Sequence, residues 1–245
     1  KVNPDKSHLI LSSTDTTKSA MINGKKILNE NEVELLGVTF DNALNFENHI
    51  GNLCAKASNK LHALSRISVY MDLGKRRSLM NSFFLSQFSY CPLVWMFHSR
   101  NLNNRINKLH ERSLRIVYRD TTSSFQDLLS KDKSYTIHAR NIQNLAIELF
   151  KVKTGIAPIF MNEIFTMKEN LRYPSKQIFV TRNVHSVYFG THTLSHLGPK
   201  IWLIIPEEIK ESTSLEIFKM KIRKWNPVNC PCRICKTYLD KVGFI

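Results

Sequence analysis

The spacing of apolar residues changes near residue 41, from every second position to every third or fourth. Residues 6–41 hold short apolar stretches of strand length, and Asn23-Gly24 separates two of them. Both residues tolerate the positive φ of a tight turn, so this pair predicts a β-hairpin. We therefore expect a small antiparallel sheet near the N-terminus.

Residues 42–120 follow a helical period and predict three successive helices. The first covers residues 46–67. The second starts near Lys75 and bends or ends at Pro92, which has no backbone N–H to donate. The third covers roughly residues 102–118. Its apolar stripe, at spacings of three and four, is formed by Leu102, Ile106, Leu109, Ser113 and Val117.

Two further helices are expected in the C-terminal half. One carries the apolar positions between residues 142 and 150 and ends at a break that begins with Gly155. The other covers residues 214–225. Linkers, if present, are expected near residues 120–134 and 166–177.

The segment between residues 177 and 205 departs from the helical period. Its β-branched and aromatic residues predict one or two short strands, and Gly198-Pro199 predicts a turn before Trp202. The chain is therefore expected to adopt an α+β fold that is predominantly α. The strand-forming positions are Ile178, Val180, Val184, Val187, Tyr188 and Phe189.

Composition limits the class of protein. The chain has 245 residues, of which 42% are hydrophobic, and this suffices for one ordinary core or two small ones. We find no secretory signal and no apolar run of the ~20 residues that a membrane span needs, so no membrane partner is expected. Because the chain starts at Lys1 rather than Met, we interpret it as a fragment of a larger intracellular protein.

The net charge favours an anionic partner. Lys and Arg number 35 against 20 Asp and Glu, which gives +15, and such an excess is typical of nucleic-acid-binding proteins. Between residues 73 and 119, nine basic residues face Glu111 alone, a net charge of +8. More than half of the excess is therefore concentrated in the second and third predicted helices.

Five cations of the third helix lie beside its apolar stripe, again at spacings of three and four. Phosphates would neutralise their mutual repulsion, so they predict contact with a nucleic-acid backbone, to which Lys75, Arg76 and Arg77 of the second helix would add. The alternative is a solvated helix face whose counterions are simple salt. This basic ridge consists of Arg105, Lys108, Arg112, Arg115 and Arg119.

The cysteines indicate a reducing compartment and one candidate metal site. Cys54 and Cys91 lie in apolar helical patterns, where a buried thiol acts as a small hydrophobe. Cys230, Cys232 and Cys235 are too close together for a distributed disulfide scaffold and offer soft ligands for Zn²⁺. Structural zinc usually takes four ligands, so a distant histidine, a second molecule and the absence of a metal remain alternatives.

Familiar catalytic motifs are absent from the sequence. The nine histidines are scattered, and none belongs to an H-E-x-x-H motif. There is no P-loop, no G-x-G-x-x-G and no close aspartate pair suited to two-metal chemistry. The residues by themselves therefore predict a nucleic-acid-binding helical domain.

Several short motifs, taken in order, resemble the reverse transcriptases of LINE-type retrotransposons, which are the non-LTR elements of jockey-like and CR1-like kind. The resemblance covers nearly the whole chain and corresponds to the C-terminal part of such polyproteins. The motifs are NPDKS (3–7), LLGVTFD (35–41), NFENHI (45–50), LSQFSYCPLVW (85–95), NKLHERSLRIVY (107–118), LGPKIW (197–202) and CPCRICKTYLDKVGFI (230–245).

The resemblance implies a division into four parts. Residues 1–41 would be the end of the palm with a primer-grip-like hairpin, and residues 42–120 a thumb-like helical bundle lying along the primer-template duplex. Residues 121–225 would form a C-terminal helical region with short strands, and residues 226–245 a Cys-bearing tail. The tail resembles a terminal cysteine cluster that is supposed to bind nucleic acid or zinc.

The same resemblance assigns roles to individual residues. Lys6 falls on a palm lysine near the incoming nucleotide. Leu36, Gly37 and Val38 fall on the primer grip. The Mg²⁺-binding aspartates of these polymerases would precede Lys1, so we expect this chain alone neither to bind Mg²⁺ nor to act as an RNA-directed DNA polymerase.

The expected partners follow from this assignment. They are an RNA template, an RNA/DNA or DNA duplex, and the rest of the polyprotein with its endonuclease, fingers and palm, in the nucleus or the cytoplasm. The alternative is a relic or repurposed, non-enzymatic nucleic-acid-binding helical module. A third hypothesis is an unrelated basic scaffold that binds protein.

Overall fold

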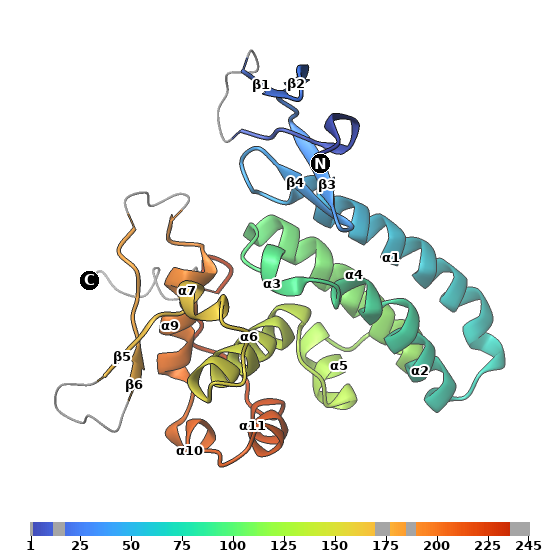
Figure 1. Cartoon of the computed structure of the whole chain (residues 1–245). Helices are drawn as coiled ribbons and strands as arrows, with labels where there is room; N and C mark the ends of the chain where they lie inside the picture. Colours follow the sequence, from blue (N-terminus) through green and yellow to red (C-terminus); the bar gives the residue numbers. More distant parts are fainter. Residues whose placement is uncertain (1, 12–17, 170–176, 185–189, 236–245) are drawn as a thin grey trace, which may run out of the picture.

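The computed structural model describes residues 2–11, 18–169, 177–184 and 190–235. Helices dominate these parts of the chain, and the strands form three separate two-stranded antiparallel sheets (Figure 1). The predicted α+β, predominantly α class is confirmed. The expected strand positions Val187, Tyr188 and Phe189 lie outside the described residues.

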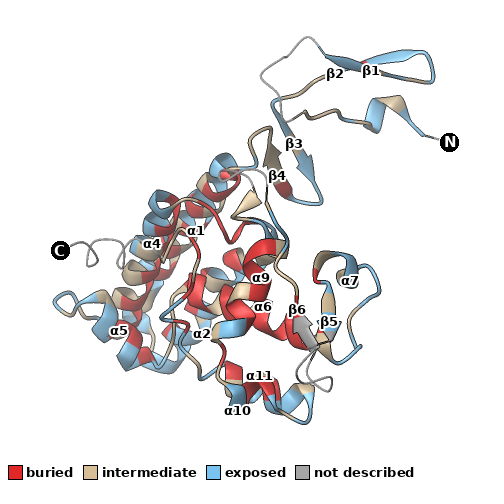
Figure 2. Ribbon diagram, turned by 90° about the vertical axis from the view of Figure 1, so that its left-hand side faces the viewer, coloured by how far each residue is buried: buried red, intermediate tan, exposed pale blue. Residues whose placement is uncertain are grey.

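Two hairpins form the N-terminal part, instead of the one sheet that the alternation suggested. β1 (Ser19–Ile22) pairs with β2 (Lys25–Leu28) around the predicted Asn23-Gly24 turn, whose φ angles are 49° and 79°. β3 (Glu32–Leu35) pairs with β4 (Val38–Asp41), and no ladder joins the two hairpins. The β1–β2 hairpin projects from the helical body and is largely exposed, whereas β4 packs against α1 (Figure 2).

Three helices form the first core. α1 (Glu47–Ile67) and α4 (Arg100–Tyr118) lie side by side, and α2 (Leu73–Phe83) packs against both (Figure 1). Arg112 contacts His62, and Arg119 contacts Ser68, so α1 and α4 run in the same direction. The fully buried side chains of this core include Ile50, Leu61, Leu64, Met80, Phe84, Trp95, Ile106 and Leu114.

Pro92 begins a helix rather than only ending one. After α2, a short 3₁₀ segment, Leu85–Phe88, leads to α3 (Pro92–Trp95). Proline suits the first helical position because the N–H of that position has no partner in the helix. Cys91 precedes it with a φ of 43° and is exposed, so its predicted burial is wrong, whereas Cys54 is buried as expected.

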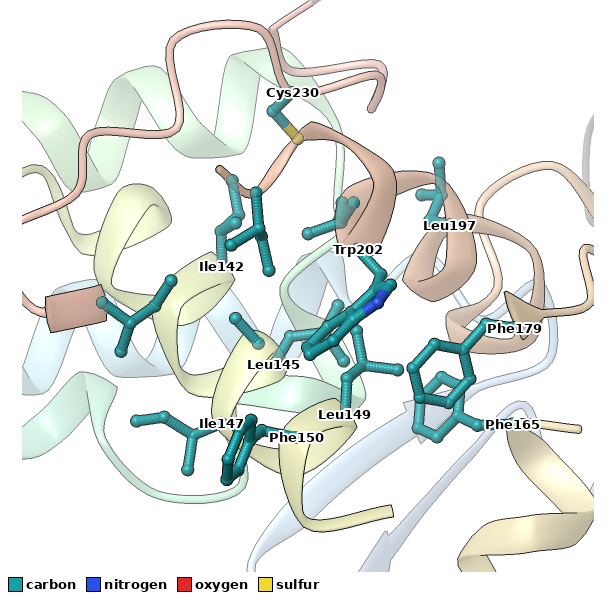
Figure 3. Packing of buried hydrophobic residues seen from close by; sticks show 14 of the residues in the cluster. Ile142, Leu145, Ile147, Leu149, Phe150, Phe165, Phe179, Leu197, Trp202 and Cys230 are labelled. Atoms are coloured by element: carbon teal, nitrogen blue, oxygen red, sulfur yellow. The ribbon is translucent and has the colours of Figure 1, made fainter. Parts of the chain in front are cut away.

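A second core surrounds α6 (Ile137–Lys153). It is closed by α9 (Leu194–Ile204), α11 (Leu215–Ile222) and the hairpin of β5 (Met167–Glu169) and β6 (Gln177–Phe179). Figure 3 shows Leu145, Leu149 and Phe150 of α6 facing Trp202 of α9. The ring centroids of Phe150 and Phe218 are 4.2 Å apart in a stacked arrangement. Two short helices complete this part, α7 (Met161–Ile164) and α10 (Glu207–Lys210).

The expected linker at residues 120–134 contains a helix, α5 (Phe125–Asp132). Ser124 and Asp127 form a capping box, in which each side chain accepts a hydrogen bond from the other residue's backbone N–H. The S-x-x-D pattern was present in the sequence and would have predicted this start.

The turn predicted at Gly198-Pro199 is wrong, because both residues lie inside α9. Pro199 is its sixth residue and interrupts the hydrogen bonding there. The helix continues because Leu197, Ile201 and Trp202 are buried in the second core, so tertiary packing outweighs the local cost. Gly198 permits close packing against the Phe165 ring.

Substitution of Gly198 by Ala should therefore destabilise the protein, although alanine favours helices. The added methyl would lie 2.5 Å from Cε1 of Phe165, and such overpacking costs about 1–3 kcal/mol. Gly51 in α1 provides a matched control, because an added Cβ meets nothing within 4 Å and Gly51→Ala should stabilise by up to ~1 kcal/mol. Urea unfolding measures both, and equal stability of the two variants would contradict the packing argument.

Candidate metal centre and nucleic-acid interface

The chain after α11 returns to the start of α6 and brings three cysteines to one histidine. Cys230, Cys232, Cys235 and His138 each offer one ligand atom, and these atoms all lie within 4.8 Å of one another. The four side chains could hold a metal ion. No other group of three or more His, Cys, Asp or Glu side chains within the described residues meets this criterion.

Local structure fixes the histidine. His138 is the second residue of α6, and Thr136 caps that helix by accepting a hydrogen bond from the Ala139 N–H at 3.2 Å. Nε2 of His138 lies 3.2 Å from Sγ of Cys232. Cys230, Cys232 and His138 are all buried, so the cluster is largely removed from water.

The three sulfurs differ in electrostatic environment. Hydrogen bonds from the Cys230 and Cys235 thiols hold the pKa of Cys232 well below its usual value, and the contact with His138 acts in the same direction. Donating to Cys232 raises the pKa of Cys230. A lowered pKa favours the thiolate form of Cys232, which is the form that binds metals.

Several hydrogen bonds hold the tail against the helices. The Tyr135 hydroxyl donates to the Lys224 carbonyl at 2.6 Å, and Gln143 Nε2 donates to the Trp225 carbonyl at 2.8 Å. Arg233, between the second and third cysteines, donates from Nε to the His98 carbonyl at 3.0 Å. The cysteines are thus positioned by bonds from their neighbours as well as by their own contacts.

The fourth ligand could not be identified from the sequence. His138 precedes Cys230 by 92 residues, and only the packing of the tail on α6 brings them together. Of the three alternatives for the tail, this geometry supports the distant histidine.

The basic ridge divides into two groups. Arg105 and Lys108 are exposed and make no hydrogen bond or ion pair with the described residues. Arg112 bonds to Nδ1 of His62 at 3.3 Å, and Arg115 pairs with Glu111 at 2.6 Å. Arg119 donates to the carbonyls of Ser68 and Val69 at the end of α1.

The basic residues of α2 are mostly occupied within the protein. Arg76 is buried and donates to the carbonyls of Val117 at 2.8 Å and Met71 at 3.1 Å. Val117 is in the last turn of α4, where carbonyls lack a helical partner, so Arg76 caps that helix end. Arg77 pairs with Asp132 at 2.9 Å, and Lys75 pairs with Asp72 at 3.3 Å.

The candidate residues of the first part lie apart from the cysteine cluster. Lys6 is exposed at the end of a 3₁₀ turn, Pro4–Lys6. Leu36 and Gly37 form the turn between β3 and β4, with φ angles of 49° and 78°, and the Leu36 carbonyl accepts the Tyr90 hydroxyl at 2.7 Å. Val38 is buried against the first core, whereas Leu36 and Gly37 are exposed.

Comparisons with known protein families, with curated proteins and with solved structures gave no match. In the described parts of the chain, no helix combines the length and the apolar character that crossing a membrane requires.

Arg76 and its neighbour Lys75 should contribute very differently to the stability of the protein. Arg76→Ala should destabilise the protein by about 2–4 kcal/mol, because it leaves two carbonyls without a charged donor and opens a buried space. Lys75→Ala removes the same charge from an exposed pair and should change stability by less than about 0.5 kcal/mol. Denaturant unfolding gives the free energy of unfolding of both variants. Equal losses of stability would exclude the capping role of Arg76.

Proposed function

We propose that the chain binds a nucleic-acid duplex through its phosphates, using the face formed by α4 and the adjoining edge of α1. The observation that carries this proposal is the exposure of Arg105 and Lys108, which have no partner among the described residues. Arg112 continues the same stripe. Seven residues of helix separate Arg105 from Arg112, or ~10 Å along the axis.

The acidic content of α4 favours this use of the face. Glu111 is the helix's sole carboxylate, and it is paired with Arg115. The one acid near Lys108 on this helix is therefore already engaged, and Arg105 has no acid within four residues of it in α4. An anionic strand placed along the stripe would meet mainly positive charge.

Contacts of this kind position a duplex without reading its sequence. Each neutralised phosphate releases a counterion, so the affinity falls steeply with salt. We therefore infer a binding activity with weak base preference and strong dependence on ionic strength.

We further propose that the chain corresponds to the C-terminal part of a LINE-type retrotransposon reverse transcriptase, in which this face would hold the primer-template. The support is the ordered series of motifs, together with the position of α4 inside the segment that the resemblance assigns to the thumb. The hairpin of β3 and β4, immediately before α1, occupies the place of the primer grip in that assignment.

For the cysteine cluster we propose Zn²⁺ in a structural role. Three thiolates and one imidazole are a typical ligand set for structural zinc, and four protein ligands leave no open position for substrate. The bound ion would join the tail to the first turn of α6. Closing that long loop would contribute to the stability of the second core.

Binding to an RNA/DNA hybrid tests the first proposal. Arg105→Gln combined with Lys108→Gln should lower the affinity about tenfold or more at low salt and reduce the slope of log K against log salt by about 1–2. The matched control is Lys168→Gln with Lys224→Gln, which removes two exposed charges elsewhere. Fluorescence anisotropy across a salt series measures both pairs, and identical losses would show that only net charge matters.

Metal analysis tests the zinc proposal. Protein purified without chelator should contain about one zinc per chain, as structural Cys₃His sites do. Cys232→Ser should lose most of it and unfold at lower temperature, whereas the exposed Cys91→Ser should keep it. Zinc-free wild-type protein whose thermal stability does not respond to added zinc would exclude the site.

A further inference from the structure

A polar cavity of about 720 Å³ lies among α2, the 3₁₀ segment after it, the start of α6 and the end of α11. It is separate from the basic ridge, since neither α1 nor α4 contributes to its lining. It also lies outside the cysteine cluster, none of whose residues lines it. The polar residues that matter for its chemistry are Arg77, Asp132, Ser134, Arg140, Asn141 and Arg223.

The cavity carries an excess of positive charge. Arg77, Lys133, Arg140 and Arg223 line it together with one carboxylate, Asp132. That carboxylate already pairs with Arg77 at 2.9 Å and accepts the Tyr118 hydroxyl at 2.8 Å. Lys133, Arg140 and Arg223 therefore form no ion pair in the cavity, although Asp132 raises the pKa of Arg140 and Arg223 donates to Oδ1 of Asn144 at 2.8 Å.

Buried donors in the cavity lack acceptors. Nδ2 of Asn141 is buried and has no hydrogen-bond partner among the described residues, and the whole residue is only 3% exposed. Oγ of Ser134 is likewise buried and unpartnered within those residues. Both residues line the cavity, and such groups are costly to leave unsatisfied, so a ligand that accepts hydrogen bonds from them would be stabilised.

Arg140 adds a partly buried guanidinium to the cavity lining. Its guanidinium makes no hydrogen bond or salt bridge with the described residues. Burial lowers the pKa of Arg140, and the nearby charges of Arg223 and Arg77 lower it further, which Asp132 offsets in part. An anion in the cavity would relieve this repulsion. Arg140 lies in the first turn of α6, where the helix dipole also favours negative charge.

We propose that this cavity binds a phosphomonoester, with Arg140, Arg223 and Asn141 donating hydrogen bonds to the phosphate oxygens. Arginine suits this task because its planar fork of N–H groups matches a phosphate. The remaining space suffices for a nucleoside beside the phosphate. Leu85 and Ile137 provide an apolar part of the wall.

The ligand chemistry admits two sources, a free nucleotide or the terminal phosphate of a nucleic-acid strand. The site does not depend on duplex binding by the ridge, because the two surfaces share no residue. Failure of one proposal would therefore leave the other intact.

The test uses the full chain, purified without chelator, at constant ionic strength. Calorimetry and thermal unfolding with inorganic phosphate, AMP and adenosine should show saturable binding of phosphate and AMP and none of adenosine. Arg223→Gln and Arg140→Gln should each weaken AMP about tenfold or more, because each removes a charged donor. Lys168→Gln, an exposed lysine outside the cavity, should leave the affinity unchanged.

The exposed position of Arg223 gives a second variant that should fold even if Arg140→Gln does not. Arg140 is largely buried, so its variant could fail to fold, but Arg223 is exposed at the rim and its substitution should leave the circular dichroism spectrum unchanged. An equal rise in unfolding temperature with phosphate in the wild type and Arg223→Gln would mark a general salt effect and overturn the proposal. Binding of adenosine as tight as that of AMP would overturn it too.

The source of the phosphate is decided with short oligonucleotides. Stronger binding of a 5′-phosphorylated strand than of AMP and of the same strand with a 5′-hydroxyl would support the site and assign it to a strand end. Binding of AMP that exceeds binding of the phosphorylated strand would support the site and assign it to a free nucleotide. Failure of both AMP and the phosphorylated strand to bind more tightly than their unphosphorylated forms would overturn it.

Discussion

The burial of α6 is the constraint on which the other features depend. Of its 17 residues, 12 are buried, with α9 and α11 packed on it and α3 and α4 in contact with it. A helix enclosed in this way has one position and one rotation about its axis. Its first five residues therefore present His138 to the cysteines and Asn141 to the polar cavity, from a rigid element that suits a binding site.

Only part of the excess positive charge is available to an external partner. Arg76 and Arg119 donate to carbonyls at the ends of α4 and α1, and they tie these parallel helices and α2 together. Arg115 is used within its own helix. A count of Lys and Arg thus overstates the charge available to a partner, and the exposed remainder on α4 matters more than the total.

The tail and the bundle depend on each other through long-range contacts. Cys232 and His138 are 94 residues apart in sequence, and the tail also bonds to the segment after α3 through Arg233. Closing so long a loop costs conformational entropy, which several simultaneous contacts must offset. The cysteine–histidine cluster, the hydrogen bond from the Gln143 side chain to the Trp225 carbonyl and the packing of Trp225 on the second core act together in this respect.

The sequence by itself determined the elements whose signals are local. The hairpin at Asn23-Gly24 and the helices α1, α4, α6 and α11 follow from turn chemistry and periodicity, which involve residues a few positions apart. The same holds for the three clustered cysteines. Only the tertiary structure decided that Gly198 lies inside a helix, because contact with the Phe165 ring is a long-range effect. It also decided that His138 completes the cysteine cluster. In the same way, Arg76 is buried, whereas Arg105 has no partner among the described residues. These outcomes could not be read from the sequence because they depend on which distant segments meet.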